Sequence, residues 1–184
     1  MHIYDSRFPL AQNARRKEAD APVSEYRKVQ ERLGLERVVV VVQFQMDGRY
    51  LHERESLLAA LPCTLVIEHI GKFLEPVPPS DPGFQALLRL VDSGRVWVKL
   101  SGAYMMSKSG PPLYEDIGVL AKALVKHAPE RLVWASNWPH PLPSRTRVPD
   151  DAALLDLLLD WAPEERTRNR ILATNPAQLY GFEK

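Results

Sequence analysis

Three histidines in this sequence stand where an imidazole could take part in chemistry. His69 closes one apolar segment, His140 lies in the loop after another, and His2 opens a short segment near the N-terminus. An imidazole can bind zinc, polarise a carbonyl oxygen or carry a proton near neutral pH. Each histidine taken alone could equally be a hydrogen-bonded structural side chain, but their shared placement beside apolar segments favours a functional site.

The remaining histidines and the single cysteine are better explained structurally. His52 lies in a charged helix start, and His127 lies near the end of a predicted helix, where the helix dipole favours a cation. Cys63 is expected to be a small buried side chain at the start of a strand rather than a nucleophile.

Polar side chains follow three apolar segments, each at the point where the segment ends. In parallel α/β folds, the carboxyl ends of the strands form the face at which ligands bind and catalysis occurs. We therefore expect one site built from these strand ends. The segments are 64–67, followed by Glu68 and His69; 96–100, followed by Ser101; and 132–135, followed by Ser136, Asn137 and His140.

Strand-like runs alternate with helical segments along the chain. The β-branched run at 38–42 is typical of a buried strand, and Gly34 suits the C-cap of the helix before it. This alternation predicts an α/β fold of parallel βα units in a single domain, 1–184. The expected strands are 2–4, 38–42, 64–70, 95–100 and 131–135, and the expected helices are 23–33, 51–61, 84–91, 117–127, 152–161 (capped by Asp150 or Asp151) and 164–173.

Composition and charge argue against several classes of partner. The 184 residues carry 24 basic and 23 acidic side chains without a basic block, so neither nucleic acid nor an anionic membrane is expected as a partner. A single cysteine cannot form an internal disulfide and fits a reducing compartment. Since no apolar run is long enough for a membrane span and the first residues do not read as a secretory leader, a cytoplasmic location is expected.

Five segments, in chain order, resemble the amidohydrolase superfamily, in the branch of 2-pyrone-4,6-dicarboxylate hydrolase. The match is collinear from one end of the chain to the other, and this order carries more weight than any single short motif. The segments are 2–5, similar to the end of a His-x-His motif; 66–72, similar to Asp-His-x-Gly; 98–104, similar to Lys-Leu-Ser-Gly; 132–140, similar to Gly-Ser-Asp-Trp-Pro-His; and 175–182, similar to the family's C-terminal ending.

The resemblance implies a (β/α) barrel hydrolase in which water opens a lactone, without a metal in this branch. Histidines at strand ends polarise the carbonyl, arginines hold the substrate carboxylates, and an aspartate after the last strand acts as general base. Carried over, His2 would be the second histidine of the first strand and His69 the carbonyl-binding histidine. Asn137 stands at the aspartate position, where an amide cannot accept a proton. His140 and Glu68 are then the nearest alternative bases.

These considerations give a set of expected site residues and cofactors. No cofactor is expected, and the alternative is a single divalent metal such as zinc, held by His2 and His69. The expected catalytic residues are His2, His69, Asn137 and His140, and the expected substrate-binding residues are Arg49, Lys72, Ser101 and Tyr104, with Lys99 a further candidate for a substrate carboxylate.

The length of the chain is short for a full barrel of this type. A (β/α)₈ barrel takes about 250 residues, and the run 38–42 continues into 43–48 without a turn residue or a helix. We therefore predict an internal deletion with its junction near 42–43, and an incomplete barrel of about five strands. An open sheet of this kind exposes edges and apolar surface, which favours a homo-oligomer.

Two functions remain open at this point. The first is a hydrolase that cleaves a lactone or similar cyclic ester of a carboxylated small molecule. The alternative is a catalytically weak or inactive remnant that binds a small acid or self-associates. A zinc-dependent decarboxylase is a third interpretation, since amidohydrolases related to this branch perform that reaction with a bound zinc.

Overall fold

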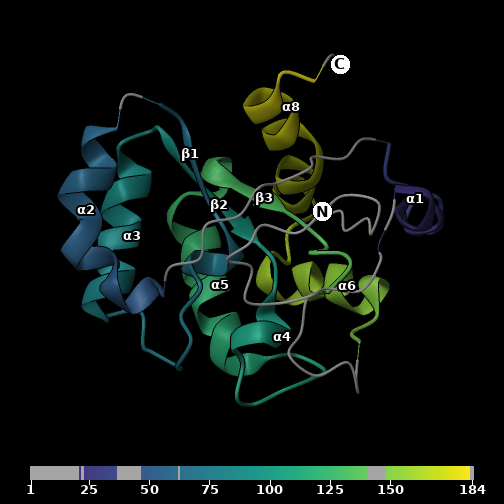
Figure 1. Ribbon diagram of the computed structural model, residues 1–184, viewed down its shortest axis with the longest axis horizontal. Helices are drawn as coiled ribbons and strands as arrows, with labels where there is room; N and C mark the ends of the chain where they lie inside the picture. The colour runs from purple at the N-terminus through teal and green to yellow at the C-terminus, as the bar shows by residue number, and fades with distance from the viewer. Residues whose placement is uncertain (1–20, 22, 37–46, 62, 141–147, 183–184) are drawn as a thin grey trace, which may run out of the picture.

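A computed structural model describes residues 21, 23–36, 47–61, 63–140 and 148–182 (Figure 1). Its centre is a parallel sheet of three strands in the order β1-β2-β3, formed by β1 (Leu65–Ile67), β2 (Val96–Leu100) and β3 (Leu132–Trp134). In the register of the sheet, Ile67 lies opposite Val98, and Val98 lies opposite Leu132. All three carboxyl ends therefore meet at one edge.

Helices and helical turns connect the strands. Within the described residues, no helix is both long and apolar enough to cross a lipid bilayer. The helices are α1 (Val23–Arg32), α2 (Leu51–Ala60), α3 (Pro82–Asp92), α4 (Ala103–Met106), α5 (Glu115–His127), α6 (Asp151–Trp161), α7 (Glu165–Asn169) and α8 (Asn175–Tyr180); 3-10 turns cover Gly48–Tyr50, His69–Gly71 and Pro129–Arg131, and a π turn at Arg170–Thr174 joins α7 to α8.

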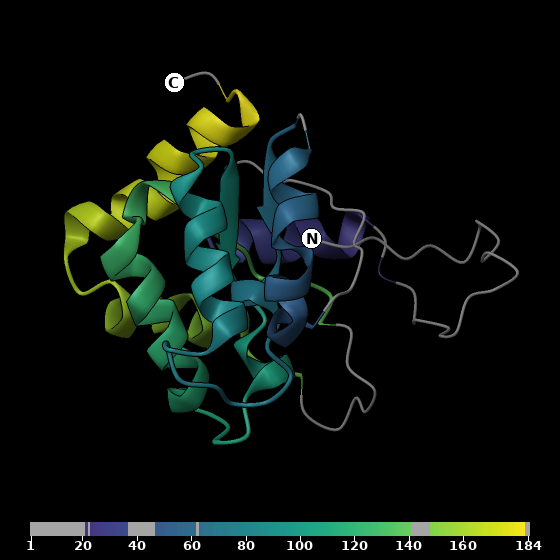
Figure 2. The same ribbon diagram turned by 90° about the vertical axis from the view of Figure 1, so that its left-hand side faces the viewer.

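The sheet is anchored by a layer of helices on one face. Figure 2 shows α2 and α3 in front of the strands, and α2 packs along α3. Val98 and Leu100 of β2 are fully buried in one cluster with Phe84 of α3 and Leu120 of α5. Burying a side chain of this size contributes about 1.5–3 kcal/mol to the free energy of unfolding, so this cluster holds β2 in place. The backbone hydrogen bonds of β2 then hold β1 and β3 beside it.

The predicted α/β class with parallel βα units is confirmed, and three of the predicted strands are found as β1, β2 and β3. The first is shorter than predicted, because His69 and Ile70 adopt left-handed backbone angles (φ 54° and 55°) that end strand pairing at Ile67. The predicted strands 2–4 and 38–42 and the junction near 42–43 lie outside the described residues. The number of strands and the completeness of the barrel therefore stay predictions.

Most of the predicted helices are confirmed, with two differences. The last one continues through the π turn as far as Tyr180, and α4 was not predicted. Of the two proposed caps for α6, Asp150 accepts the hydrogen bonds from the helix start, so Asp151 is left for another role.

Cys63 is exposed, so its predicted burial is wrong: β1 begins only at Leu65, and Cys63 lies in the bend before it.

The loop after α4 is closed by one carboxylate, Asp116 in the first turn of α5. Its oxygens accept hydrogen bonds from Ser107 Oγ (2.6 Å), the Lys108 amide (2.6 Å) and both the amide and hydroxyl of Ser109 (3.2 and 2.8 Å). Burial by itself would raise the pKa of Asp116, but these donors outweigh it and lower the pKa from 3.8 to about 2. This anchor matters because α4 carries Tyr104.

Because the folded-state pKa of Asp116 lies below its ordinary value, its stabilising contribution is present above about pH 4 and is lost as the pH falls toward about 2. We expect Asp116→Asn to flatten the fall in unfolding free energy across this window, measured by urea titrations at several pH values. Asp156→Asn, on the exposed side of α6, is the control and should keep the wild-type pH dependence. An unchanged profile in Asp116→Asn would contradict the assignment.

Candidate functional site

The carboxyl ends of β1, β2 and β3 bring most of the predicted site residues to one edge of the sheet. His69 follows β1, Ser101 follows β2, and Asn137 and His140 follow β3. All four side chains are buried, with exposed fractions of 1–5%. Buried polar groups persist in native folds when they are hydrogen-bonded, so their partners define what this edge can do.

His69 is held by the neighbouring strand. Its Nδ1 lies 2.9 Å from Ser101 Oγ, which fixes the orientation of the ring. Gly102 makes room for this arrangement: its φ is +66°, and a Cβ at this position would lie 2.8 Å from His69 Nδ1. Ser101 thus orients His69 through a hydrogen bond, and Gly102 leaves space for its ring because it has no side chain.

The backbone at these strand ends is unusual. His69, Lys72, Asn137 and His140 have φ between 54° and 60°, in the left-handed region that costs a non-glycine residue of order 1–3 kcal/mol. Such conformations persist only when the surrounding packing holds them, and they cluster at functional sites. No sequence signal marks them, because none of these residues is glycine.

A chain of hydrogen bonds runs inward from the end of β3. Asn137 Nδ2 donates to Tyr104 Oη (2.7 Å), and Tyr104 Oη lies 3.1 Å from His140 Nδ1. On the other side of the ring, His140 Nε2 lies 3.0 Å from Asp151 Oδ1. The structure therefore joins two predicted catalytic residues, Asn137 and His140, through Tyr104, which was predicted only to bind substrate.

Asp151 is the functional candidate that the sequence did not reveal. It was one of the two proposed caps of α6, but Asp150 takes that role, and Asp151 is turned inward with 5% exposure. Its second oxygen lies 3.4 Å from Arg32 Nη2 at the end of α1. The charge of Asp151 also acts on Tyr26. Burial is the largest cause that raises the pKa of Tyr26, the charge of Asp151 raises it further, and a hydrogen bond with Ser136 lowers it by less.

Glu68 and Lys99 form a second buried pair next to His69. Lys99 Nζ lies 2.6 Å from Glu68 Oε1, with side-chain exposures of 6% and 16%. Burial and the charge of Glu68 together raise the pKa of Tyr180 to about 12. Lys99, which was expected to hold a carboxylate of the substrate, is therefore already paired with a carboxylate of the protein, Glu68.

The remaining predicted residues lie around this edge with different partners. Lys72 is buried, and its backbone carbonyl accepts a hydrogen bond from the backbone amide of Gly48. This bond brings the segment that contains Arg49 close to the end of β1. The Arg49 side chain binds Asp47 through Nε (3.0 Å) and Nη2 (2.7 Å). Their binding to substrate stays a prediction. His2 lies outside the described residues.

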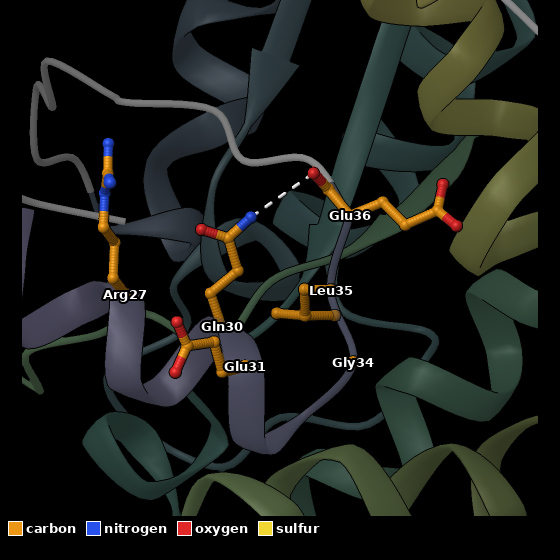
Figure 3. A pocket seen from close by; sticks show the side chains of 6 residues that line it. All are labelled: Arg27, Gln30, Glu31, Gly34, Leu35 and Glu36. Carbon is orange, nitrogen blue, oxygen red and sulfur yellow. Dashed lines mark hydrogen bonds between the residues drawn. The ribbon is translucent and has the colours of Figure 1, made fainter.

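Two hollows lie on the described surface, and they differ in their relation to the strand ends. One, of about 500 Å³, is formed by the end of α1 and the turn after it; Figure 3 shows Gln30 bonded to the Glu36 carbonyl, with Arg27 and Glu31 on the helix beside it. It includes no strand-end residue. A larger groove of about 1070 Å³ runs along 133–136 and the C-terminal helices and reaches Lys99. It adjoins the end of β3 at Ser136, the residue before Asn137.

The metal alternative requires a set of ligands that the described residues do not form. Among them, no group of three or more histidine, cysteine, aspartate or glutamate side chains is arranged to hold a metal ion. A zinc site needs at least three protein ligands, and the described residues bring no such set together around His69. We therefore derive no chemical step through a metal.

Consecutive parallel βα units with a buried histidine and amide cluster at the strand ends are consistent with part of a TIM-barrel-like fold. The chain belongs to the amidohydrolase family, whose model matches residues 15–182. The resemblance inferred from the short collinear motifs is thereby confirmed.

Several relatives are named for reactions of lactones. The chain is 38% identical to a D-galactarolactone isomerase of Agrobacterium fabrum over 159 residues, which cover 86% of this chain and 53% of that protein. It is 38% identical to a 4-sulfomuconolactone hydrolase of Hydrogenophaga intermedia (76% and 46% covered) and 29% identical to a 2-pyrone-4,6-dicarboxylate hydrolase of Comamonas testosteroni (79% and 49%). The chain thus spans about half the length of these curated relatives.

Solved structures show the same fold. An apo structure of an Agrobacterium tumefaciens protein is 37% identical with a TM-score of 0.70 and covers 88% of this chain and 56% of its own. A probable 2-pyrone-4,6-dicarboxylic acid hydrolase of Acinetobacter baumannii with citric acid bound is 16% identical with a TM-score of 0.81 (98% and 97% covered). A zinc-bound amidohydrolase of Burkholderia multivorans is 20% identical with a TM-score of 0.63 (87% and 58%).

The space beside His69 yields a stability prediction. Gly102→Ala would combine left-handed strain with a contact on the imidazole, whereas Gly34→Ala has φ +63° and nothing within 4 Å of the new Cβ. We expect both variants to lose about 1–2 kcal/mol from strain, and Gly102→Ala to lose about 1–3 kcal/mol more from overpacking. Urea unfolding measures both, and equal losses would show that Gly102 is not needed for the histidine.

Proposed function

We propose that this chain opens the ring of a lactone carried by a carboxylated small molecule, with water as the nucleophile. The observation that carries the proposal is the buried cluster at adjacent strand ends, with His69 fixed by Ser101 and Asn137 fixed on Tyr104. The relatives named for lactone hydrolysis or isomerisation support the same substrate class.

Each side chain has a definite role in this proposal. His69 binds the lactone carbonyl oxygen and stabilises the negative charge that develops on it. Asn137 orients the attacking water or donates to the oxyanion, since its amide cannot take a proton at neutral pH. Lys72 and Arg49, which lie near the same strand end, hold the substrate carboxylates. His2 would complete the carbonyl-binding group as a second histidine.

A second reaction, lactone isomerisation, is favoured by Asn137 and by the 38% identity to a D-galactarolactone isomerase. In isomerisation, a hydroxyl of the substrate itself attacks the lactone carbonyl. One ester C–O bond forms as the other breaks, and the proton of the attacking hydroxyl ends on the released oxygen. No water is consumed, so the site needs no carboxylate to activate a water molecule, although the attacking hydroxyl must still lose its proton.

The two reactions are separated by a panel that includes 2-pyrone-4,6-dicarboxylate, 4-sulfomuconolactone and D-galactarolactone. Hydrolysis incorporates oxygen from labelled water into a new carboxylate, and isomerisation does not. We expect His69→Ala to lower kcat/KM by about 10²–10³ in either case, the loss typical of one oxyanion donor. We expect Asn137→Asp to raise hydrolysis, because a carboxylate can accept the proton of water.

His52→Ala is the matched control, because His52 is exposed and bonds only a local carbonyl within the described contacts; it should retain wild-type rates. No turnover by the folded wild type and by Asn137→Asp would overturn the proposal. The alternative, a remnant that binds a small acid or self-associates, would then lead. Light scattering during size-exclusion chromatography would show whether the chain forms the oligomer expected from exposed edges.

The metal alternative has its own test. We expect purified protein to hold less than about one tenth of an equivalent of zinc, since a structural or catalytic zinc site binds its ion tightly through three or more ligands. Elemental analysis before and after dialysis against a chelator measures this. Stoichiometric zinc that resists dialysis would instead place a metal at His69 and revive the decarboxylase interpretation.

A further inference from the structure

His140 cannot act on a substrate directly in this structure, because both of its ring nitrogens face protein groups. Nδ1 lies 3.1 Å from Tyr104 Oη, and Nε2 lies 3.0 Å from Asp151 Oδ1. The ring is 5% exposed, whereas Tyr104 is only partly buried. Of the two groups that contact the ring nitrogens, the Tyr104 hydroxyl is therefore the one from which a proton can reach a substrate, because the Asp151 carboxylate is itself buried.

We propose that Tyr104 is the catalytic residue that transfers the proton in this site, with His140 and Asp151 as the residues that position it and take up its proton. The inference rests on the proposed action on a lactone and supplies the base that Asn137 cannot provide. It applies to both candidate reactions, because water and a substrate hydroxyl alike must lose a proton on attack.

The donors and acceptors assign a direction to the chain of hydrogen bonds. Asp151, as a carboxylate, can only accept, so His140 carries its proton on Nε2. Nδ1 is then an acceptor and receives the Tyr104 O–H. The Asn137 amide donates to the same tyrosine oxygen at 2.7 Å. This is the arrangement of a nucleophile activated by a histidine that a carboxylate orients, with a phenol in place of the nucleophile.

The chemical step balances without any further reactant. As the oxygen of water or of a substrate hydroxyl bonds to the lactone carbonyl carbon, its proton moves to Tyr104 Oη. The phenolic proton moves at the same time to His140 Nδ1, and Asp151 stabilises the resulting imidazolium. When the ring C–O bond breaks, the proton returns along the same path to the leaving oxygen, and the relay is restored.

Glu68, the other carboxylate considered as a base, is less suited to this role. Its Oε1 lies 2.6 Å from Lys99 Nζ, and both side chains are largely buried. Protonating Glu68 would leave a buried ammonium without its counter-charge, which costs several kcal/mol. Asp151, in contrast, keeps its charge throughout the proposed step and is held from the far side by Arg32 at 3.4 Å.

The strained backbone of the β3 end is consistent with this role. Asn137 and His140 both have φ of 60°, and both direct their side chains to the single oxygen of Tyr104. Two left-handed residues within four positions are costly, and the contact with Tyr104 is what the two conformations have in common.

The first test reads the proton directly and needs no substrate. In ¹⁵N-histidine-labelled protein at about pH 8, above the ordinary histidine pKa of about 6.5, His140 should show a protonated Nε2 and an unprotonated Nδ1. The signal is assigned by its loss in His140→Gln. In Asp151→Asn, an amide N–H can face Nε2, so the proton should move to Nδ1. A His140 protonated on Nδ1 in the wild type would overturn the relay.

The second test is a kinetic double-mutant cycle on the lactone that the panel identifies. Tyr104→Phe should lower kcat by about 10²–10³, within the range of general acid–base catalysis, and change KM by less than about threefold. Asp151→Asn should lower kcat by at least about tenfold. Since residues of one relay act as a unit, the double variant should be no slower than Tyr104→Phe. Additive losses, or losses confined to KM, would overturn the relay.

Asp156→Asn, at an exposed position on α6, is the matched control for Asp151→Asn and should leave kcat unchanged. The failures of the two proposals are distinguishable. A panel without turnover would overturn the lactone function, while the histidine spectrum would still decide whether the relay exists.

Discussion

Parallel pairing of β1, β2 and β3 is the constraint on which the rest of the structure depends. Because the three strands run in the same direction, the residues that follow Ile67, Leu100 and Trp134 all emerge at one edge. The central strand is held there by burial of Val98 and Leu100 against α3 and α5. A hydrogen bond such as the one between Ser101 and His69 then joins residues 32 positions apart in the sequence.

The strand ends combine unfavourable and favourable terms in a small volume. Left-handed conformations at His69, Asn137 and His140 cost several kcal/mol together, and burying their polar atoms adds a desolvation cost. The contacts to Ser101, Tyr104 and the Asp151 carboxylate offset these costs only while all of them are made. Such a network is rigid, and this rigidity is what a site needs to hold a carbonyl and a nucleophile in fixed relation.

Asn137 gives this member of the amidohydrolase family its particular character. Where the family resemblance leads one to expect a carboxylate, the chain has an amide bound to Tyr104. A buried carboxylate, Asp151, lies behind His140 instead; it belongs to α6 and is tied to α1 through Arg32. In our proposal, the carboxylate that supports catalysis is therefore Asp151 of α6 and not the residue at position 137 after β3.

The sequence by itself determined the class of fold, the family and the positions of His69, Ser101, Asn137 and His140 at strand ends, because apolar runs, helix periodicity and collinear motifs are local signals. It could not supply the partners. The sequence left Asp150 and Asp151 as equal candidates for the cap of α6 until the structure gave that role to Asp150, and it did not show that Lys99 pairs with Glu68. Cys63 looked buried until β1 proved to begin beyond it. These outcomes depend on contacts between residues up to 119 positions apart, and only tertiary packing decides which of several acceptors a buried donor meets.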